Sequence, residues 1–110
     1  MTDYRSRRRE LARMVARRDE TRQLIAIITD SLRRKAERQT LNDRPKARAY
    51  GRHATTWTPA DERHFLAVLA RLHERNRPEF VRLQGRLVRQ DTAIAALRAR
   101  LGVNEPDTAP

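Results

Sequence analysis

The chain has no cysteine, only three glycines and only two lysines in 110 residues. The lack of cysteine excludes disulfide staples, thiolate chemistry and any cysteine-based zinc site. With so few glycines, the sequence contains no glycine-rich phosphate loop. The longest uninterrupted apolar run, residues 24–28, is far too short to cross a membrane. We therefore expect a cytoplasmic protein of a reducing compartment, without a membrane partner.

Catalytic patterns are also missing. The three histidines, His53, His64 and His73, lack the spacing of metal ligands. Asp61 and Glu62 follow Thr58-Pro59 and are typical of a helix cap, and no nucleophile stands beside a plausible base. We expect a protein that is not an enzyme and that uses neither a metal nor a cofactor.

What the sequence does have is arginine. Twenty-three arginines and two lysines face 14 acidic residues, which gives a formal net charge of +11. Arginine grips phosphate with a planar fork of donors, and an excess charge of this size attracts polyanions. Residues 1–53 carry a net charge of +9 and residues 54–101 carry +4. The pattern predicts that a polyanion, most simply a nucleic-acid backbone, meets the N-terminal half first.

Apolar periodicity predicts an all-α fold with one long N-terminal helix over about residues 3–40. A basic linker over residues 41–57 follows, in which Pro45 disfavours helix. A second helix over 58–75 begins with the cap Thr58, and a third over 77–101 begins after the cap Asn76 and ends at Gly102. We expect these helices to form a single small helical bundle over residues 1–101, with residues 102–110 as a disordered tail.

The apolar stripe of the first helix predicts the core, but arginine interrupts it. The residues of this stripe that should face the core are Leu24, Ile25, Ile28 and Leu32. The residues of the later helices that they should meet are Phe65, Leu69, Leu72, Leu87 and Ile94. Arg18 lies on the same side as this stripe, and an unpaired arginine inside a core is costly. We therefore expect the N-terminal half of the first helix to overhang the bundle in solvent.

Three groups of residues are candidates for contacting nucleic acid. The first is a ladder at spacing four on the long helix, where repeated like charges favour a bound polyanion. The second is the linker, in which basic residues alternate with aromatic rings, and Tyr50 or Trp57 could stack on a base of a single strand. The third is an arc of arginines on the third helix, opposite its apolar seam. The candidates are Arg9, Arg13, Arg17, Arg34 and Arg38; Arg44, Lys46, Arg48, Tyr50, Arg52 and His53; and Arg82, Arg86, Arg89 and Arg100.

In charge, size and helical make-up, and with exposed-looking apolar residues such as Ile27 and Val81, the chain resembles the small non-catalytic helical subunits of multi-subunit CRISPR effector complexes. The resemblance covers the whole chain as architecture and charge and involves no diagnostic motif. It implies a subunit of a ribonucleoprotein assembly that contacts single-stranded RNA or DNA through backbone phosphates, beside other protein subunits or copies of itself. Two other interpretations remain, namely a duplex DNA-binding protein of the nucleoid or plasmid type and a helical structural adaptor of a phage or secretion assembly.

Overall fold

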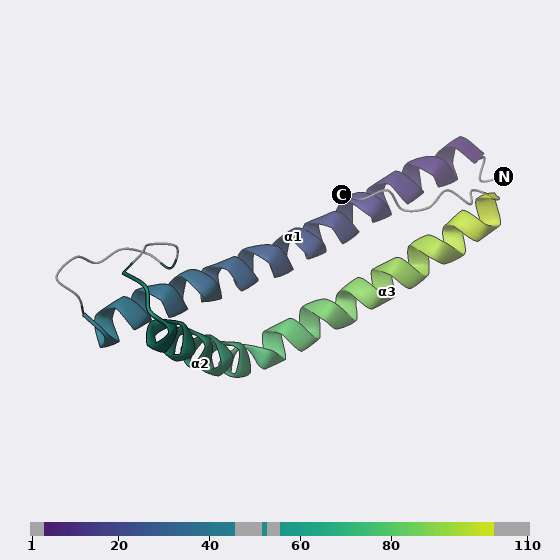
Figure 1. The fold of residues 1–110 in the computed structure, drawn as a ribbon. Coiled ribbons are helices and arrows are strands. Elements are labelled where there is room, and N and C mark those ends of the chain that lie inside the picture. The colour runs from purple at the N-terminus through teal and green to yellow at the C-terminus, as the bar shows by residue number, and fades with distance from the viewer. Residues whose placement is uncertain (1–3, 46–51, 53–55, 103–110) are drawn as a thin grey trace. The chain divides into compact units, whose positions relative to one another are not determined.

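The computed structural model describes residues 4–45, 52 and 56–102. Its elements are three helices, α1 (Tyr4–Asp43), α2 (Pro59–Arg75) and α3 (Arg77–Leu101), shown in Figure 1. The described part contains no strand. The predicted all-α fold class is therefore confirmed. The expected disorder of residues 103–110 falls outside the described residues.

The long helix continues to Asp43, slightly beyond the predicted end. It contains neither glycine nor proline, so nothing in its interior breaks the hydrogen-bond ladder. At its end the buried Thr40 hydroxyl donates to the Ala36 carbonyl (2.8 Å), and the Arg44 N–H donates to the Thr40 carbonyl (2.9 Å). Pro45 follows directly, which explains why the helix stops there.

The predicted cap at the start of α2 is confirmed in full. The Thr58 side chain accepts a hydrogen bond from the Asp61 N–H (3.1 Å), and the Asp61 carboxylate accepts one from the Thr58 N–H (2.8 Å). These reciprocal bonds form a capping box, and Pro59 occupies the first helical position, where its missing N–H costs nothing. Asp61 is almost fully buried, so this box lies at the edge of the core.

A single residue, Asn76, separates α2 from α3. Its backbone N–H donates to the carbonyls of Leu72 and His73, and its side-chain amide donates to the Leu72 carbonyl (2.7 Å). Asn76 therefore satisfies carbonyls at the end of α2, and its own carbonyl accepts the first bond of α3, from Phe80. At the far end of α3, Gly102 has a φ of 70°, the left-handed conformation that the sequence predicts for a helix-ending glycine.

The described residues fall into two compact units. The first unit consists of residues 4–24 of α1 and residues 82–102, and the second consists of residues 25–45, 52 and 56–81. Each unit is described by itself below. The expectation of a single domain over residues 1–101 stays a prediction.

The first unit is a pair of helical segments with a thin apolar core. Leu11 of α1 packs with Ile94 and Leu97 of α3, and Met14 and Val15 contact the same cluster. Because the two segments come from opposite ends of the chain, the N-terminal turns of α1 lie beside the C-terminal turns of α3 (Figure 1). The expected overhang of the N-terminal half of α1 in solvent is therefore wrong, since this segment packs along α3.

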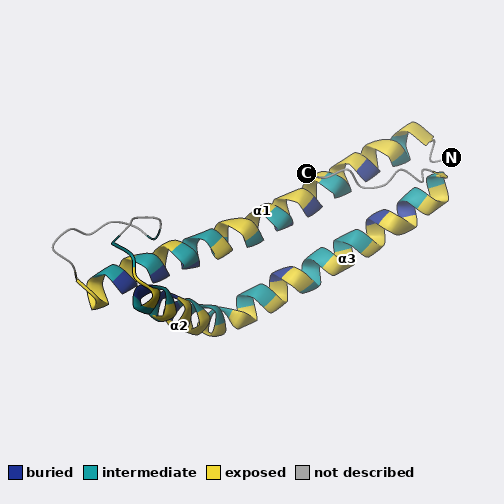
Figure 2. Cartoon of the chain, viewed as in Figure 1, coloured by how far each residue is buried: buried dark blue, intermediate teal, exposed yellow. Residues whose placement is uncertain are grey.

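In the second unit, α2 packs against the C-terminal part of α1. Phe65 and Val68 of α2 and Ala36 of α1 are almost completely buried against one another. Trp57, just before α2, meets the Phe65 ring edge to face at a centroid distance of 6.1 Å. Figure 2 shows dark blue, buried positions on both α1 and α2.

The expected core of α1 is only partly correct. Leu32 is buried, but Ile25 and Ile28 are half-buried and Leu24 is 42% exposed. Ile27 is 51% exposed, so the most apolar run of the chain contains no buried residue. The periodicity located the inner side of α1, but which turns of that side are covered depends on where the partner helices lie.

Candidate nucleic-acid interface

The N-terminal ladder lies on the surface of the first unit. Arg9, Arg13 and Arg17 follow one another at spacing four on α1, and all three are exposed. None of them forms an ion pair with a carboxylate of the described residues. Their positive charges are therefore available to a partner.

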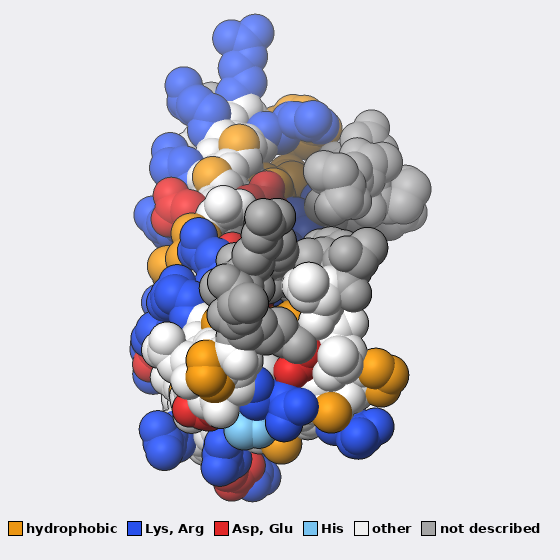
Figure 3. All heavy atoms as spheres, turned by 60° about the vertical axis from the view of Figure 1, so that its left-hand side comes forward, with side chains coloured by type: hydrophobic (Ala, Val, Ile, Leu, Met, Phe, Trp, Pro, Cys, Tyr) orange, Lys and Arg blue, Asp and Glu red, His pale blue; other side chains and the backbone are white. Residues whose placement is uncertain are grey.

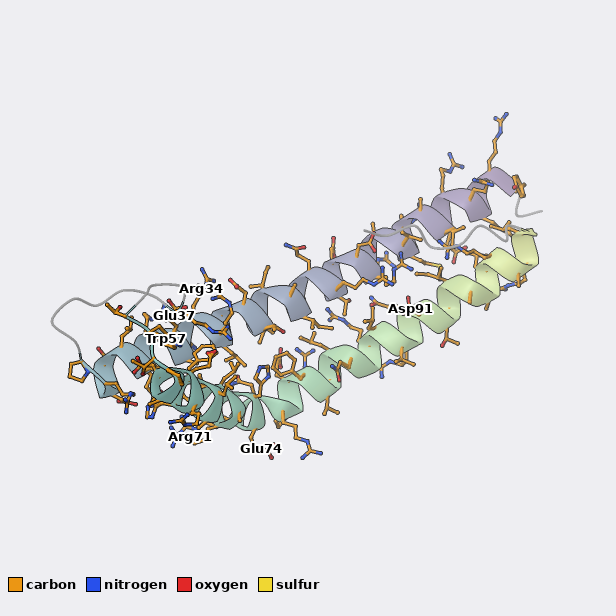
Figure 4. All side chains as sticks on the ribbon, in the orientation of Figure 1. Arg34, Glu37, Trp57, Arg71, Glu74 and Asp91 are labelled. Carbon is orange, nitrogen blue, oxygen red and sulfur yellow. The ribbon has the colours of Figure 1, made fainter. Side chains whose placement is uncertain are left out.

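Arg18 is the largest departure from the sequence-based expectation. Its side chain is only 3% exposed, and its guanidinium reaches two carboxylates, Asp19 of the same helix (3.2 Å) and Asp91 of α3 (3.5 Å). Arg22, one turn further along, shares both acids at 3.7 and 4.0 Å. Figure 4 shows Asp91 on α3 within this pair of segments. The interruption of the apolar stripe is thus an ion-pair layer in which a buried Arg18, paired with half-exposed carboxylates, joins α1 to α3.

The arc on α3 lies at the side of the helix pair, which corrects its expected place opposite the seam. Arg82, Arg89 and Arg100 are exposed, as predicted, but Arg86 is half-buried. The Arg86 Nε donates to the Thr21 hydroxyl of α1 at 3.2 Å. Arg86 therefore lies at the border between the two helices, and Arg82, Arg89 and Arg100 are exposed on the same arc of α3.

In the second unit the ladder residues are neutralised to different extents. The Arg34 Nε lies 3.2 Å from Asp30, and the neighbouring Arg33 binds the same carboxylate at 2.9 Å. The hydrogen bond from Arg33 lowers the pKa of Asp30 below its ordinary value, with charge from Arg34 adding to it. Arg38 is exposed and forms no ion pair with the described residues. Arg34 is thus a weaker candidate than Arg38.

Two arginines of the linker hold the second unit together. The Arg44 Nε binds the buried Asp61 carboxylate at 2.6 Å. Arg52 binds Glu62 (2.6 Å), and its guanidinium lies 4.4 Å from the centre of the Phe65 ring. These contacts give two arginines, interpreted from sequence as binding residues, a structural role. The other linker candidates, Lys46, Arg48, Tyr50 and His53, lie outside the described residues.

We predict that Arg52→Ala destabilises the second unit by about 1–2 kcal/mol, because it removes a charge-assisted pair and a cation–π contact that are both partly shielded from solvent. Arg63→Ala, an exposed position of α2 without an ion pair to the described residues, is the matched control and should change stability by less than about 0.5 kcal/mol. Urea unfolding followed by the fluorescence of the single tryptophan measures both, and equal losses would remove the structural role of Arg52.

Ring stacking on a base has little support from Trp57. Its ring is half-buried against Phe65 and forms part of the second unit's core. Its Nε1 is buried without a hydrogen-bond partner among the described residues. In Figure 4, Trp57 lies with Arg34 and Glu37 near α1, whereas Arg71 and Glu74 lie on the side of α2 that points away from α1.

Two histidines of the described residues have partners within the fold. His64 bonds Asp43 at 2.8 Å and the His73 ring stacks on Phe80. No cluster of three metal-ligating side chains occurs among residues 4–45, 52 and 56–102, and no helix there has the length and hydrophobicity to span a membrane. Comparisons with protein-family models, curated proteins and solved structures find no match to the chain.

Proposed function

We propose that this protein is a non-enzymatic nucleic-acid-binding subunit that holds single-stranded RNA or DNA by its phosphate backbone through arginines. A small helical subunit of a ribonucleoprotein assembly fits this role. Support comes from the distribution of ion pairs between the two units. Blue Lys and Arg side chains spread over much of the face in Figure 3, with red carboxylates between them.

The helical segments of the second unit nearly balance their own charge, and the other basic residues of this unit are Arg44, Lys46, Arg48 and Arg52. Its helical segments contain eight basic and seven acidic residues. Arg33, Arg34 and Arg77 each have a carboxylate partner, as do Arg44 and Arg52 beside the helices. A polyanion gains little from cations that already have counter-charges, so we do not place the main contact here.

The first unit keeps most of its charge unneutralised, and this observation carries the proposal. Its helical segments contain thirteen arginines and four acidic residues, while Asp3, Glu105 and Asp107 fall outside the described residues. Nine of these arginines form no ion pair with a described carboxylate. They are Arg5, Arg7, Arg9, Arg13, Arg17, Arg86, Arg89, Arg98 and Arg100. Phosphates would supply the missing counter-charges.

A protein neighbour is part of the proposal. Leu24 and Ile27 are 42% and 51% exposed within the chain's most apolar run. Large exposed apolar side chains are typical of surfaces that another protein covers. This supports other subunits, or copies of the chain, beside the nucleic acid.

Fluorescence anisotropy with labelled single-stranded RNA, single-stranded DNA and duplex DNA of equal length tests the proposal. We expect the single strands to bind most tightly, with affinities for two unrelated sequences within about threefold, because phosphate contacts carry no sequence information. A preference for duplex would favour the nucleoid or plasmid type of DNA-binding protein. Failure to bind any of the three at low salt would contradict the proposal and favour the structural adaptor.

A further inference from the structure

The border between α1 and α3 in the first unit has two sides with different chemistry. On one side, Arg18 and Arg22 of α1 share the carboxylates of Asp19 and Asp91. Each of these arginines already has counter-charge within a few ångströms. A phosphate that approached this side would be repelled by two carboxylates, so we do not expect phosphate to bind there.

The other side contains arginines bridged by a neutral hydroxyl. The Arg86 Nε donates to the Thr21 Oγ1 (3.2 Å), which itself donates to the Arg17 carbonyl (3.2 Å). Arg17 and Thr21 are one turn apart on α1, so they lie on the same strip of that helix. The contact therefore brings the strip of Arg17 beside the strip of Arg86.

On α3 that strip continues in both directions. Arg82, Arg86 and Arg89 have the spacing i, i+4 and i+7, which places them along one side of the helix. Asp91 is two positions beyond Arg89, which at about 100° per residue turns it to the far side. We call Arg17, Arg82, Arg86 and Arg89 the seam band. Arg17, Arg86 and Arg89 form no ion pair with a carboxylate of the described residues.

Two features of the seam band favour the binding of an extended anion. Arg86 is half-buried and tethered through its Nε, so less side-chain entropy is lost when it binds a ligand. Gly85 leaves this part of α3 without a side chain, and the Arg89 Nη1 lies 3.4 Å from where its Cβ would be. Glycine weakens a helix interior relative to alanine, and here it allows both Arg89 and a backbone to lie close to the helix.

We propose that the seam band is the phosphate-binding site of the first unit and that one nucleic-acid strand follows the border between α1 and α3. Seven residues separate Arg82 from Arg89, about 10 Å along the helix, which is enough for two or three successive phosphates. This inference rests on the proposed function. It specifies which arginines contact the strand, and it gives Arg18 and Arg22 a structural role in place of a binding role.

A charge-matched pair of triple variants tests the site in the full chain. Arg17→Gln/Arg86→Gln/Arg89→Gln removes three charges of the seam band, and Arg63→Gln/Arg71→Gln/Arg75→Gln removes three charges from exposed positions of α2 in the second unit, where we place no main contact. We expect the seam variant to weaken binding of a single-stranded oligonucleotide by about 30- to 100-fold and to reduce the salt slope by roughly two. The affinity of the control variant for the same oligonucleotide should fall by less than about fivefold.

A single variant guards against a folding defect. Arg89 is exposed, so Arg89→Gln should keep the helical circular dichroism signal and still weaken binding about three- to tenfold. Equal losses from the two triple variants, or an unchanged affinity of folded Arg89→Gln, would overturn the seam band while leaving the proposed function standing. If the unaltered protein binds no nucleic acid, both proposals fail together.

Discussion

Replacing Phe65 with alanine should destabilise the second unit by about 3–5 kcal/mol, the usual cost of removing a large buried aromatic side chain. Phe65 has no exposed surface and contacts both Ala36 of α1 and Val68 of its own helix. It also supports the Trp57 ring and lies beneath the Arg52 guanidinium.

The chain's single tryptophan reports on this unit directly. Unfolding in urea, followed by Trp57 fluorescence, should show a lower midpoint for Phe65→Ala. Leu66→Ala provides the control, since Leu66 is the next residue and is 51% exposed, and it should lose less than about 1 kcal/mol. Similar midpoints for the two variants would mean that α2 does not pack through Phe65.

Neutralising Asp19 and Asp91, which Arg18 binds, should also have a large effect. In Asp19→Asn/Asp91→Asn the guanidinium stays buried and charged but loses these two counter-charges. Removing one side of a buried pair typically costs about 3–5 kcal/mol, and because these carboxylates are half exposed we expect about 2–3 kcal/mol. Thermal or urea unfolding, followed by circular dichroism, measures the loss.

Two further variants separate burial from net charge. Adding Arg18→Met to the double variant removes the stranded cation at similar volume and should recover more than half of the loss. Glu10→Gln/Glu20→Gln changes the net charge equally at two exposed positions of the same unit and should have little effect on stability. If this control loses as much stability as the Asp19/Asp91 variant, general charge repulsion accounts for the result, and the ion pairs of Arg18 do not.

The helices and their ends were predictable because their signals are local. The capping box around Thr58 and Asp61 and the left-handed Gly102 each involve residues within one turn of the helix end. The arrangement of the helices was harder to predict from the sequence. Arg18 also pairs with its neighbour Asp19, but its link to α3 depends on Asp91, which is 73 residues away in sequence.

One signal for that layer was present in the sequence. Arg18 interrupts the apolar stripe of α1, and Gln90 interrupts the apolar seam of α3, next to Asp91. Two polar interruptions on segments that pair antiparallel are expected to meet. Treating each helix separately led to the expectation of a solvated overhang, whereas matching the interruptions would have predicted the register of the pair.

The sequence predicted which kind of residue forms the candidate site better than it predicted where those residues lie in the fold. The sequence indicated the arginines of α3, but it could not show that Arg86 reaches Thr21 and that the arc borders α1. It also could not distinguish Arg44 and Arg52, which bind Asp61 and Glu62, from cations without a partner. Those distinctions require knowing which carboxylates lie within a few ångströms, and only the fold determines this.

The salt dependence of single-strand binding tests the central claim most directly, that unneutralised arginines of the first unit hold phosphates. Binding of the unaltered protein to one single-stranded oligonucleotide should be measured by anisotropy between low and physiological salt. We predict a linear fall of log affinity with log salt concentration, with a slope of about −3 or steeper, because each phosphate contact on a single strand contributes roughly −0.7. A slope near zero, or no binding at the lowest salt, would contradict the account.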